Sequence, residues 1–573
     1  MKTHAIPACA LVFFLSISLL GQEKSKSPYL DSDTLNQTIR GIVKAQTDQK
    51  VRLLSIGKTL EGRDILGLEL GMTTTPLSSP LPPNLEPRRA WQSGLLVASG
   101  LESDSLVGSA VLMAMAQHLL DLPAKEFETL FASRKLLIIP RVDHDGTERY
   151  FRFKQGYQEP GNARPIDWDR DGRAAHEDAP QDLNKDGLVT LMRQRHPNGT
   201  WIDDPDHPGR IRLAKVDEGE LGIYRVFPES LDQDDDGEFG ENSHAGVRLD
   251  QNFSHGFKEH DATSGAHAMS EPATRSLANF VLSRPWIENV LVYGTHDNIH
   301  TLPKAGKEKQ PSSRRGRSPV SKHHAEDIKI LKLIHEVAKK NKSAAASRQQ
   351  TVPGSLEDWT YFQLGLPSAA INLWDQGVVT KGDKKEADDD TKATSQPSKS
   401  SQPTSSPTPL VAPYLPWSTV SHPTLGEVEV GGWLPFARNN PKQTEIPKLT
   451  TKQFPLIKLM LGHRAQLELT EISCKKLADA LFEVECWVVN KGSLPSQTEQ
   501  STRCRTSRPD FLMLDLDQKK ILQGTRLNRL AVLDARSGRK HFRWLLTGNT
   551  GQSLRIHLAP SRCAPLTKEI TLP

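Results

Sequence analysis

The sequence has few cysteines, few aromatic residues and almost no net charge. Of its 573 residues, 5 are cysteines and 6% are aromatic, and the formal net charge is +4. A charge this small gives no electrostatic basis for binding nucleic acid, so we expect no such partner. The cysteines show no Cys-x-x-Cys spacing, which argues against a zinc ribbon. With 36% hydrophobic residues, the chain can still bury a substantial core in more than one domain.

Long apolar runs are also missing, apart from one near the N-terminus, between Ala8 and Leu20. It follows Met1-Lys2 and precedes Gly21, and a charged start, a short apolar core and a small-residue exit are typical of a secretory signal peptide. We assign residues 1–21 to this signal. The alternative is an uncleaved anchor, although the run is short for a membrane span. We therefore predict a secreted or periplasmic protein with no membrane span after cleavage.

The cysteines outside this segment all fall in the last quarter of the chain. An exported chain meets an oxidising compartment, so we expect them to form two disulfides, in a pairing that the sequence leaves open. Free buried thiols are the alternative. The residues concerned are Cys474, Cys486, Cys504 and Cys563.

Residues 30–376, within a first domain that we assign to residues 30–440, alternate between short apolar runs and stretches of helical periodicity. The apolar runs suit buried strands, and the intervening stretches suit helices packed on them. We expect an α/β domain whose mixed sheet carries helices on both faces. The predicted strands include Leu95–Ser99, Lys135–Pro140 and Asn289–Tyr293, and the predicted helices include Val107–Leu120 and Ala273–Leu282.

The composition changes in three places. Residues 304–322 are basic and serine-rich and read as a solvated loop, and residues 381–413 cannot bury a core and read as a disordered insertion. From 461 to 573, short alternating segments separated by turns predict a β-sandwich domain. Its predicted strands are Leu467–Ile472, Phe482–Val489, Phe511–Leu516, Arg529–Leu533, Phe542–Leu546 and Ser553–Leu558.

Several short motifs follow one another in a fixed order along the first domain. They are Glu61-Gly62-Arg63, Gly94–Gly100, Ile139–Gly146, Leu249–Phe253, Ser270–Arg275, Tyr293–His296 and Leu366–Trp374. As a set they resemble the zinc carboxypeptidase family (carboxypeptidase A/B-like), most closely its large secreted bacterial branch, over roughly residues 40–440. The resemblance implies the mixed α/β fold of that family, a catalytic zinc and peptidase activity.

The resemblance also implies zinc ligands at three positions, a His and a Glu spaced as H-x-x-E and a distant His. Glu102 stands at the first position, Ser105 at the second and His296 at the third. With Asp104, Glu102 and His296 offer an oxygen-rich alternative that would hold zinc weakly and favour a harder ion. The other interpretation is that His296 is only a hydrogen-bonded histidine at a strand end.

Two further positions implied by the resemblance carry altered side chains. The general base of the family is a Glu in a pattern like Glu-Leu-Trp, and here Asn372 takes its place. The substrate carboxylate is held in the family by an Asn-Arg pair, and here the pair is Asp250-Gln251. No catalytic position is therefore intact, and we expect the ordinary reaction to be impaired or lost.

Acidic loops between residues 167 and 241 follow the pattern Asp-x-Asp/Asn-x-Asp-Gly. Alternating oxygens with a glycine for the sharp turn are typical of a loop that binds calcium, and we predict structural calcium here. The alternative is that these residues only cap turns. The predicted ligands are Asp167, Asp169, Asp171, Asp178, Asp182, Asn184, Asp186, Asp232, Asp234 and Asp236.

These observations leave three hypotheses for function. The first is an exported carboxypeptidase-like protein with impaired or lost peptidase activity, whose cleft still binds a peptide or glycan. The second is a working metallohydrolase with an atypical site. The third is a calcium-stabilised structural or adhesion protein.

Overall fold

The structure is a computed structural model. It describes residues 29–46, 48–72, 93–132, 134–152, 160–166, 181–205, 207–232, 237, 239–240, 246–306, 321–344, 352–374, 414–434, 437–506 and 508–573. Outside these residues lie the predicted signal peptide, the insertion 381–413, most of the basic segment 304–322 and the acidic loop that begins at Asp167.

The first domain is built on a mixed six-stranded sheet in the order β1-β2-β4-β3-β9-β10. The strands β3, β4, β9 and β10 run parallel, whereas β1 and β2 pair antiparallel with their neighbours. The carboxyl ends of β3, β9 and β10 therefore meet at one edge, which is where open α/β sheets place their sites. The strands are β1 (Val51–Lys58), β2 (Asp64–Leu70), β3 (Ser93–Ser99), β4 (Arg134–Ile139), β9 (Ile287–Gly294) and β10 (Ser368–Asn372).

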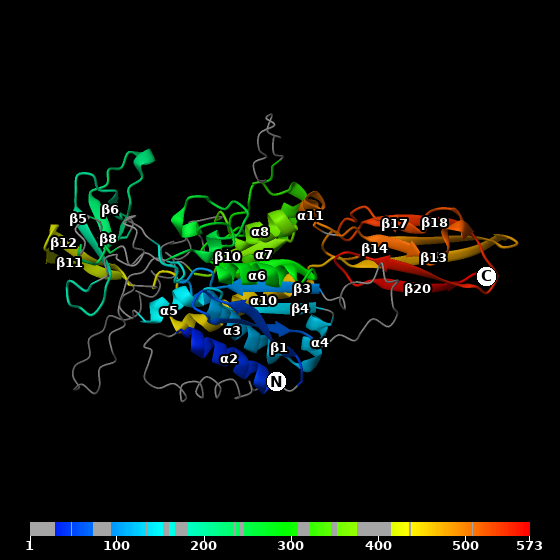
Figure 1. Ribbon diagram of the computed structural model, residues 1–573, viewed down its shortest axis with the longest axis horizontal. Helices are drawn as coiled ribbons and strands as arrows, with labels where there is room; N and C mark the ends of the chain where they lie inside the picture. The colour runs from blue at the N-terminus through cyan, green and yellow to red at the C-terminus, as the bar shows by residue number, and fades with distance from the viewer. Residues whose placement is uncertain are drawn as a thin grey trace, which may run out of the picture.

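Helices cover both faces of this sheet, which confirms the predicted fold class (Figure 1). Side chains alternate along β3, so that Leu95 and Val97 enter one core while Leu96 and Ala98 enter the other. The first core also takes side chains from α2, α3, α4, α7 and α10, and the second from α6 and α8. The helices are α2 (Ser32–Ala45), α3 (Val107–Leu120), α4 (Ala124–Phe131), α5 (His144–Arg152), α6 (Pro272–Leu282), α7 (Ala325–Asn341), α8 (Leu356–Leu364) and α10 (Ile446–Gly462).

A second six-stranded sheet stands beside the first domain, at the left of Figure 1. It joins strands from the region of the acidic loops to strands nearly 200 residues later, around the small apolar core of Met192, Phe239 and Val430. The sequence predicts only loops in the first of these regions, and this prediction was wrong. The sheet has the order β11-β12-β5-β8-β6-β7, made of β5 (Leu191–Arg195), β6 (Trp201–Asp203), β7 (Ile211–Leu213), β8 (Tyr224–Pro228), β11 (Tyr414–His422) and β12 (Gly426–Trp433).

The C-terminal region forms two four-stranded antiparallel sheets, so the predicted β-sandwich is confirmed. The predicted strand Arg529–Leu533 was wrong, because the strand in that place ends at Arg529. Two strands, β16 and β20, were not predicted. The sheets contain β13 (Leu467–Ala478), β14 (Leu481–Asn490), β16 (Ile521–Gln523) and β18 (Arg539–Thr547), and β15 (Phe511–Leu514), β17 (Leu527–Arg529), β19 (Ser553–Ala559) and β20 (Leu566–Thr571).

The four cysteines of this region are free, so the expected disulfides were wrong and the alternative of free thiols holds. Cys486 is fully buried in the sandwich core, and the Cys504 thiol donates to the Phe362 carbonyl instead. Among the described residues, no single helix is long and apolar enough to cross a membrane. Only α3 and α4 together reach that length, and they are bent by 115°.

The sandwich is fixed to α8 through the helix α11 (Glu499–Cys504). The Asp327 carboxylate accepts the backbone N–H groups of Glu499 and Gln500, each at 3.0 Å, and so caps the start of α11. At the end of α8, the Gly365 carbonyl accepts the Thr498 hydroxyl at 2.6 Å. The same helix α8 therefore contacts the sandwich at its C-terminus and, as shown below, the candidate site at its N-terminus.

Candidate metal centre

The loops that follow β3 and β9 bring Glu102 and His296 together. After β3, Gly100 takes a left-handed conformation (φ +63°), and its carbonyl accepts the N–H groups of Val142 and Asp143. This turn directs the next residues across the sheet edge, and His296 follows β9 at the same edge. Both side chains are buried, with Glu102 6% and His296 1% exposed.

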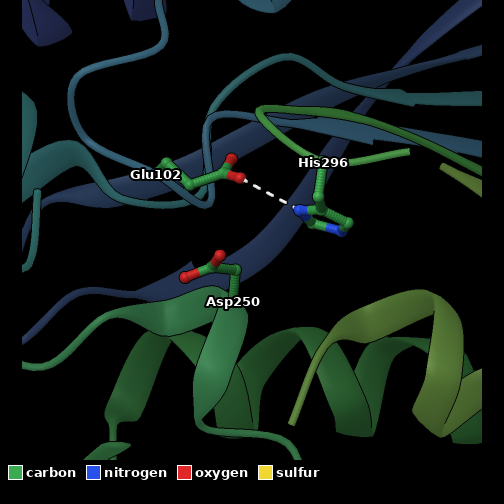
Figure 2. Close-up of side chains that lie close together, drawn as sticks. All are labelled: Glu102, Asp250 and His296. Atoms are coloured by element: carbon green, nitrogen blue, oxygen red, sulfur yellow. Dashed lines mark ion pairs between the residues drawn. The ribbon is translucent and has the colours of Figure 1, made fainter. Parts of the chain in front are cut away.

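A third acidic side chain enters from a different part of the chain. Asp250 lies in the short helix η3 (Leu249–Gln251) and is 4% exposed. One ligand atom each from Glu102, Asp250 and His296 lies within 4.8 Å of the others. Figure 2 shows the three side chains converging from separate elements. Among the described residues, this is the one group of His, Cys, Asp or Glu side chains close enough to hold a metal ion.

The hydrogen bonds leave two carboxylate oxygens of this cluster without partners. Glu102 Oε1 accepts the Thr295 N–H and hydroxyl, both at 3.0 Å, and faces His296 Nδ1 at 3.4 Å. Glu102 Oε2 and Asp250 Oδ1 are buried without a hydrogen-bond partner. Buried polar atoms are normally satisfied, so two such atoms in one cluster point to a missing ligand.

Glu357, in the first turn of α8, forms a hydrogen bond with Nε2 of His296, the ring nitrogen that does not face Glu102. Its Oε1 lies 2.8 Å from His296 Nε2, and Glu357 is 1% exposed. Burial opposes the charged imidazole, but the negative charges of Glu357 and Glu102 outweigh it and raise the pKa of His296 well above its ordinary value. Burial likewise opposes the charged form of Glu102, yet its contacts with His296 and Thr295 hold the pKa of that carboxyl below its usual range.

Asp250 and Asp104, two further carboxyls at the site, have raised pKa values. Burial, reinforced by the charge of Glu102, raises the pKa of Asp250 to about 8 and that of Asp104 to about 6. Asp104 is held apart from the cluster, because its Oδ2 accepts the Asn439 side-chain amide at 2.6 Å. The predicted site of Glu102, Asp104 and His296 therefore does not form, and Asp250 takes the place given to Asp104.

A cavity of about 200 Å³ opens onto the cluster. Arg438 and Asn439, which line it, come from the segment after the second sheet, and the sequence analysis did not single them out. Asn440 beside them accepts the N–H groups at the start of α3 (Leu106 and Val107), at 2.6 and 3.0 Å, and so fixes this segment at the site. The cavity is lined by Glu102, Asp104, Pro160, Arg248, Asp250, Gln251, Thr295, Val352, Arg438 and Asn439.

Comparison with family models gives a match over residues 37–394 to the model described as zinc carboxypeptidase. The chain belongs to the zinc carboxypeptidase family. A second model, described as a domain of unknown function (DUF8731), matches residues 466–571 in the sandwich. The search of curated proteins found no match.

Several solved structures are also similar to this chain. Thrombin activatable fibrinolysis inhibitor is 12% identical, with a TM-score of 0.41 and 78% of each chain covered. Carboxypeptidase A from Helicoverpa armigera is 15% identical, with a TM-score of 0.35, 63% of this chain covered and 71% of that chain. Murein-tripeptide amidase MpaA from Escherichia coli O157 is 14% identical, with a TM-score of 0.22 and coverages of 56% and 81%.

The family uses zinc, and the cluster fits a divalent cation. Carboxylate oxygen and imidazole nitrogen are both accepted donors for zinc, and the unpartnered oxygens of Glu102 and Asp250 supply free lone pairs. Because Nε2 of His296 is engaged by Glu357, Nδ1 is the nitrogen that faces the cluster. Ser105 is buried in the same loop but carries no carboxylate, so the family's second ligand is not reproduced at its own position.

The general-base position holds an amide with ordinary structural bonds. The Asn372 side chain donates to the Thr295 carbonyl at 3.4 Å and accepts the Trp374 N–H at 3.1 Å. At the carboxylate-binding position, Gln251 Oε1 accepts the Thr263 hydroxyl at 3.4 Å. Asn372 lacks the negative charge of the family's Glu, and Gln251 lacks the positive charge of the family's Arg. Arg248 and Arg438 are the cationic side chains among the residues that line the cavity.

Of the predicted calcium loops, the one that begins with Asp182, Asn184 and Asp186 is the second along the chain, and it lies fully within the described residues. The oxygens of Asp182, Asn184 and Asp186 accept N–H groups inside the loop, as residues that cap a turn do. A calcium loop of this pattern usually has a bidentate Glu at its twelfth position. Here that position is Arg193, which forms ion pairs with Asp203 and Glu429 and supplies no ligand. In the third loop Asp232 accepts the Gly237 N–H. Asp167, Asp169, Asp171, Asp178, Asp234 and Asp236 lie outside the described residues.

Proposed function

We propose that this family member is exported and has lost the ordinary peptidase reaction, while its cavity still binds a ligand. The observation that carries the proposal is Asn372, an amide at the position of the general base. In the family, the bound metal polarises the peptide carbonyl and provides an activated water, and a glutamate takes the proton of that water. Asn372 has no group that accepts the proton.

The cavity remains suited to a polar ligand. Arg248 and Arg438 supply positive charge at its wall, and the Gln251 amide and Asn439 supply neutral hydrogen-bonding groups. Guanidinium groups pair with carboxylates and also bond sugar hydroxyls, so the ligand class that fits is a short peptide or a glycan.

A working hydrolase with an atypical site is the second candidate. The gathering of Glu102, Asp250 and His296 favours it, because a cation held there would lie at the wall of the cavity. Its base would be Asp104, whose pKa is raised to about 6 by burial and by Glu102. A base of that pKa is suited to proton transfer near neutral pH.

A peptidase assay separates the two candidates. We expect the purified full chain, supplied with zinc, to release no C-terminal amino acid from blocked dipeptides and hexapeptides above the rate of the His296→Ala variant. The reason is that neither Asn372 nor Gln251 can carry out its family role. Hydrolysis that disappears in both His296→Ala and Asp104→Asn would instead establish the atypical hydrolase.

Structural calcium in the acidic loops also remains a proposal, supported by their spacing and by the export that the N-terminal segment predicts. We expect 5 mM CaCl2, about the level that saturates weak extracellular sites, to raise the melting temperature of the full chain. Asp182→Asn together with Asp186→Asn should remove part of that rise, because the second loop loses two carboxylates. Glu326→Gln, on an exposed helix surface, serves as the control. An unchanged melting temperature in calcium would leave the turn-capping interpretation.

A further inference from the structure

The metal cluster differs from the family's zinc site in the position along the chain that supplies its third ligand. Glu102 and His296 stand at family ligand positions, but Asp250 stands at the position that the family uses for the substrate carboxylate. We propose that Glu102, Asp250 and His296 form a relocated divalent-cation site, in which Asp250 replaces the ligand missing at Ser105. The proposal is independent of whether hydrolysis is lost.

The unpartnered oxygens are the first support. Glu102 Oε2 and Asp250 Oδ1 both belong to side chains more than nine-tenths buried, and neither has a hydrogen-bond partner. An unsatisfied buried carboxylate oxygen is costly, and a bound cation is the ligand that satisfies two of them at once. The ligand atoms already lie within 4.8 Å of one another, so only small side-chain movements are needed.

The surrounding hydrogen bonds are the second support, because they leave one atom of each of two ligands, Glu102 Oε2 and His296 Nδ1, without a hydrogen-bond partner. Thr295 binds Glu102 through Oε1 and leaves Oε2 free. Glu357 binds His296 through Nε2 and leaves Nδ1 on the side of Glu102. A carboxylate behind a histidine ligand is a common arrangement in metal sites, where it fixes the ring and its tautomer.

The relocation has a consequence for the ligand. An ion at this cluster would be held partly by Asp250, a residue at the family's carboxylate-binding position. It would supply a positive charge for a ligand carboxylate in place of the Arg that is missing at Gln251. Two carboxylates with one imidazole suit Mn²⁺ or Zn²⁺.

Asp104 and Ser105 provide the matched controls. Asp104 lines the same cavity and is partly buried, and its Oδ1 also has no hydrogen-bond partner. Its Oδ2 is held by the Asn439 amide, however, and Asp104 does not belong to the cluster. Ser105 marks the ligand position that the family uses. If the site is relocated as proposed, both residues are dispensable for cation binding.

The test is a calorimetric titration of the EDTA-treated, dialysed full chain with MnCl2, repeated with ZnCl2. We expect one site whose affinity falls by at least about 10-fold in Asp250→Asn and in Glu102→Gln, since even outer partners of metal ligands are worth 10- to 100-fold. Asp104→Asn and Ser105→Ala should bind as the unaltered chain does. Ions held by the acidic loops are a background that none of these substitutions changes.

Thermal unfolding with and without MnCl2 guards against variants that simply fail to fold. We expect Asp250→Asn to melt at or above the temperature of the cation-free chain, because it removes a buried carboxylate, and to lose the increase that the cation gives. A general loss of structure would lower both melting temperatures. The proposal is overturned if the unaltered chain binds neither ion at this site, if Asp250→Asn binds it normally, or if Asp104→Asn loses it.

Discussion

Gly365→Ala is expected to loosen the sandwich from the first domain and to cost the full chain about 3 kcal/mol of stability. Gly365 ends α8 in a left-handed conformation (φ +66°), and an added Cβ would lie 2.3 Å from Ser501 Cα and 2.4 Å from its backbone nitrogen. A left-handed non-glycine residue costs roughly 1–2 kcal/mol and overpacking a further 1–3 kcal/mol. Because the clash is with the backbone of α11, the helix has to move away as a whole.

Gly426→Ala is the matched control for this variant. Gly426 is also left-handed (φ +77°), but its added Cβ would meet no atom within 4 Å. It should therefore show only the conformational cost, about 1–2 kcal/mol. The two variants are compared by chemical unfolding, and limited proteolysis between residues 490 and 510 reports the loosened interface. Equal destabilisation of the two variants would show that the contact of α8 with α11 is not tight.

The parts of the fold that were predicted are those whose signal is local. Leu95–Ser99 and Val107–Leu120 are apolar runs long enough to show their period, and both form the expected element. The second sheet escaped prediction because β6 and β7 have only 3 residues each. In addition, one face of the sheet is packed around the guanidinium group of an arginine, which stacks on aromatic rings. Arg193 lies 4.2 Å from the ring of Tyr224 and 4.3 Å from that of Trp417, a core with no hydrophobic pattern.

The candidate site divides in the same way. Glu102 and His296 were found because they follow buried strands within short motifs, and the parallel sheet then brings the strand ends together. The position of Asp250 was known, but its approach to the cluster depends on a short helix far along the chain. Glu357 was missed, although Ser355 with Asp358 three residues later indicates a helix start there, and Ser355 does cap α8. That signal predicts where the helix begins, but it does not predict that Glu357 in its first turn contacts His296.

The number of buried acidic side chains around His296 indicates that the site still has a ligand. An abandoned zinc site would be expected to fill with water or with apolar side chains, since buried carboxylates without partners destabilise a fold. Here Asp250 adds a carboxylate to a cluster that already contains Glu102, and Glu357 adds another behind His296. Three buried acids outnumber the single positive charge that His296, with its raised pKa, supplies to them, which argues for a ligand that keeps them.

Glu288→Gln is expected to change how stability depends on pH. Glu288, on β9, is 4% exposed, and its Oε2 accepts the Ser93 hydroxyl at 2.6 Å. Burial raises the pKa of Glu288 to about 8, against the opposing effects of Ser93, Arg562 and Arg464. The folded chain therefore keeps a proton between the ordinary pKa of a glutamate, about 4.3, and pH 8, which the unfolded chain has released.

Because the unfolded state binds fewer protons in this window, this group makes stability fall as the pH rises, by about 1.4 kcal/mol per pH unit, and the fall stops above the folded pKa. The neutral amide of the Glu288→Gln variant would imitate the protonated acid at every pH. The variant should match the unaltered chain near pH 4.5 and exceed it by on the order of 5 kcal/mol at pH 8–9. Urea unfolding across this range, with exposed Glu326→Gln as control, measures the difference. If the two stability curves remain parallel, Glu288 is ionised in the folded chain, and the arginines beside it compensate for its burial.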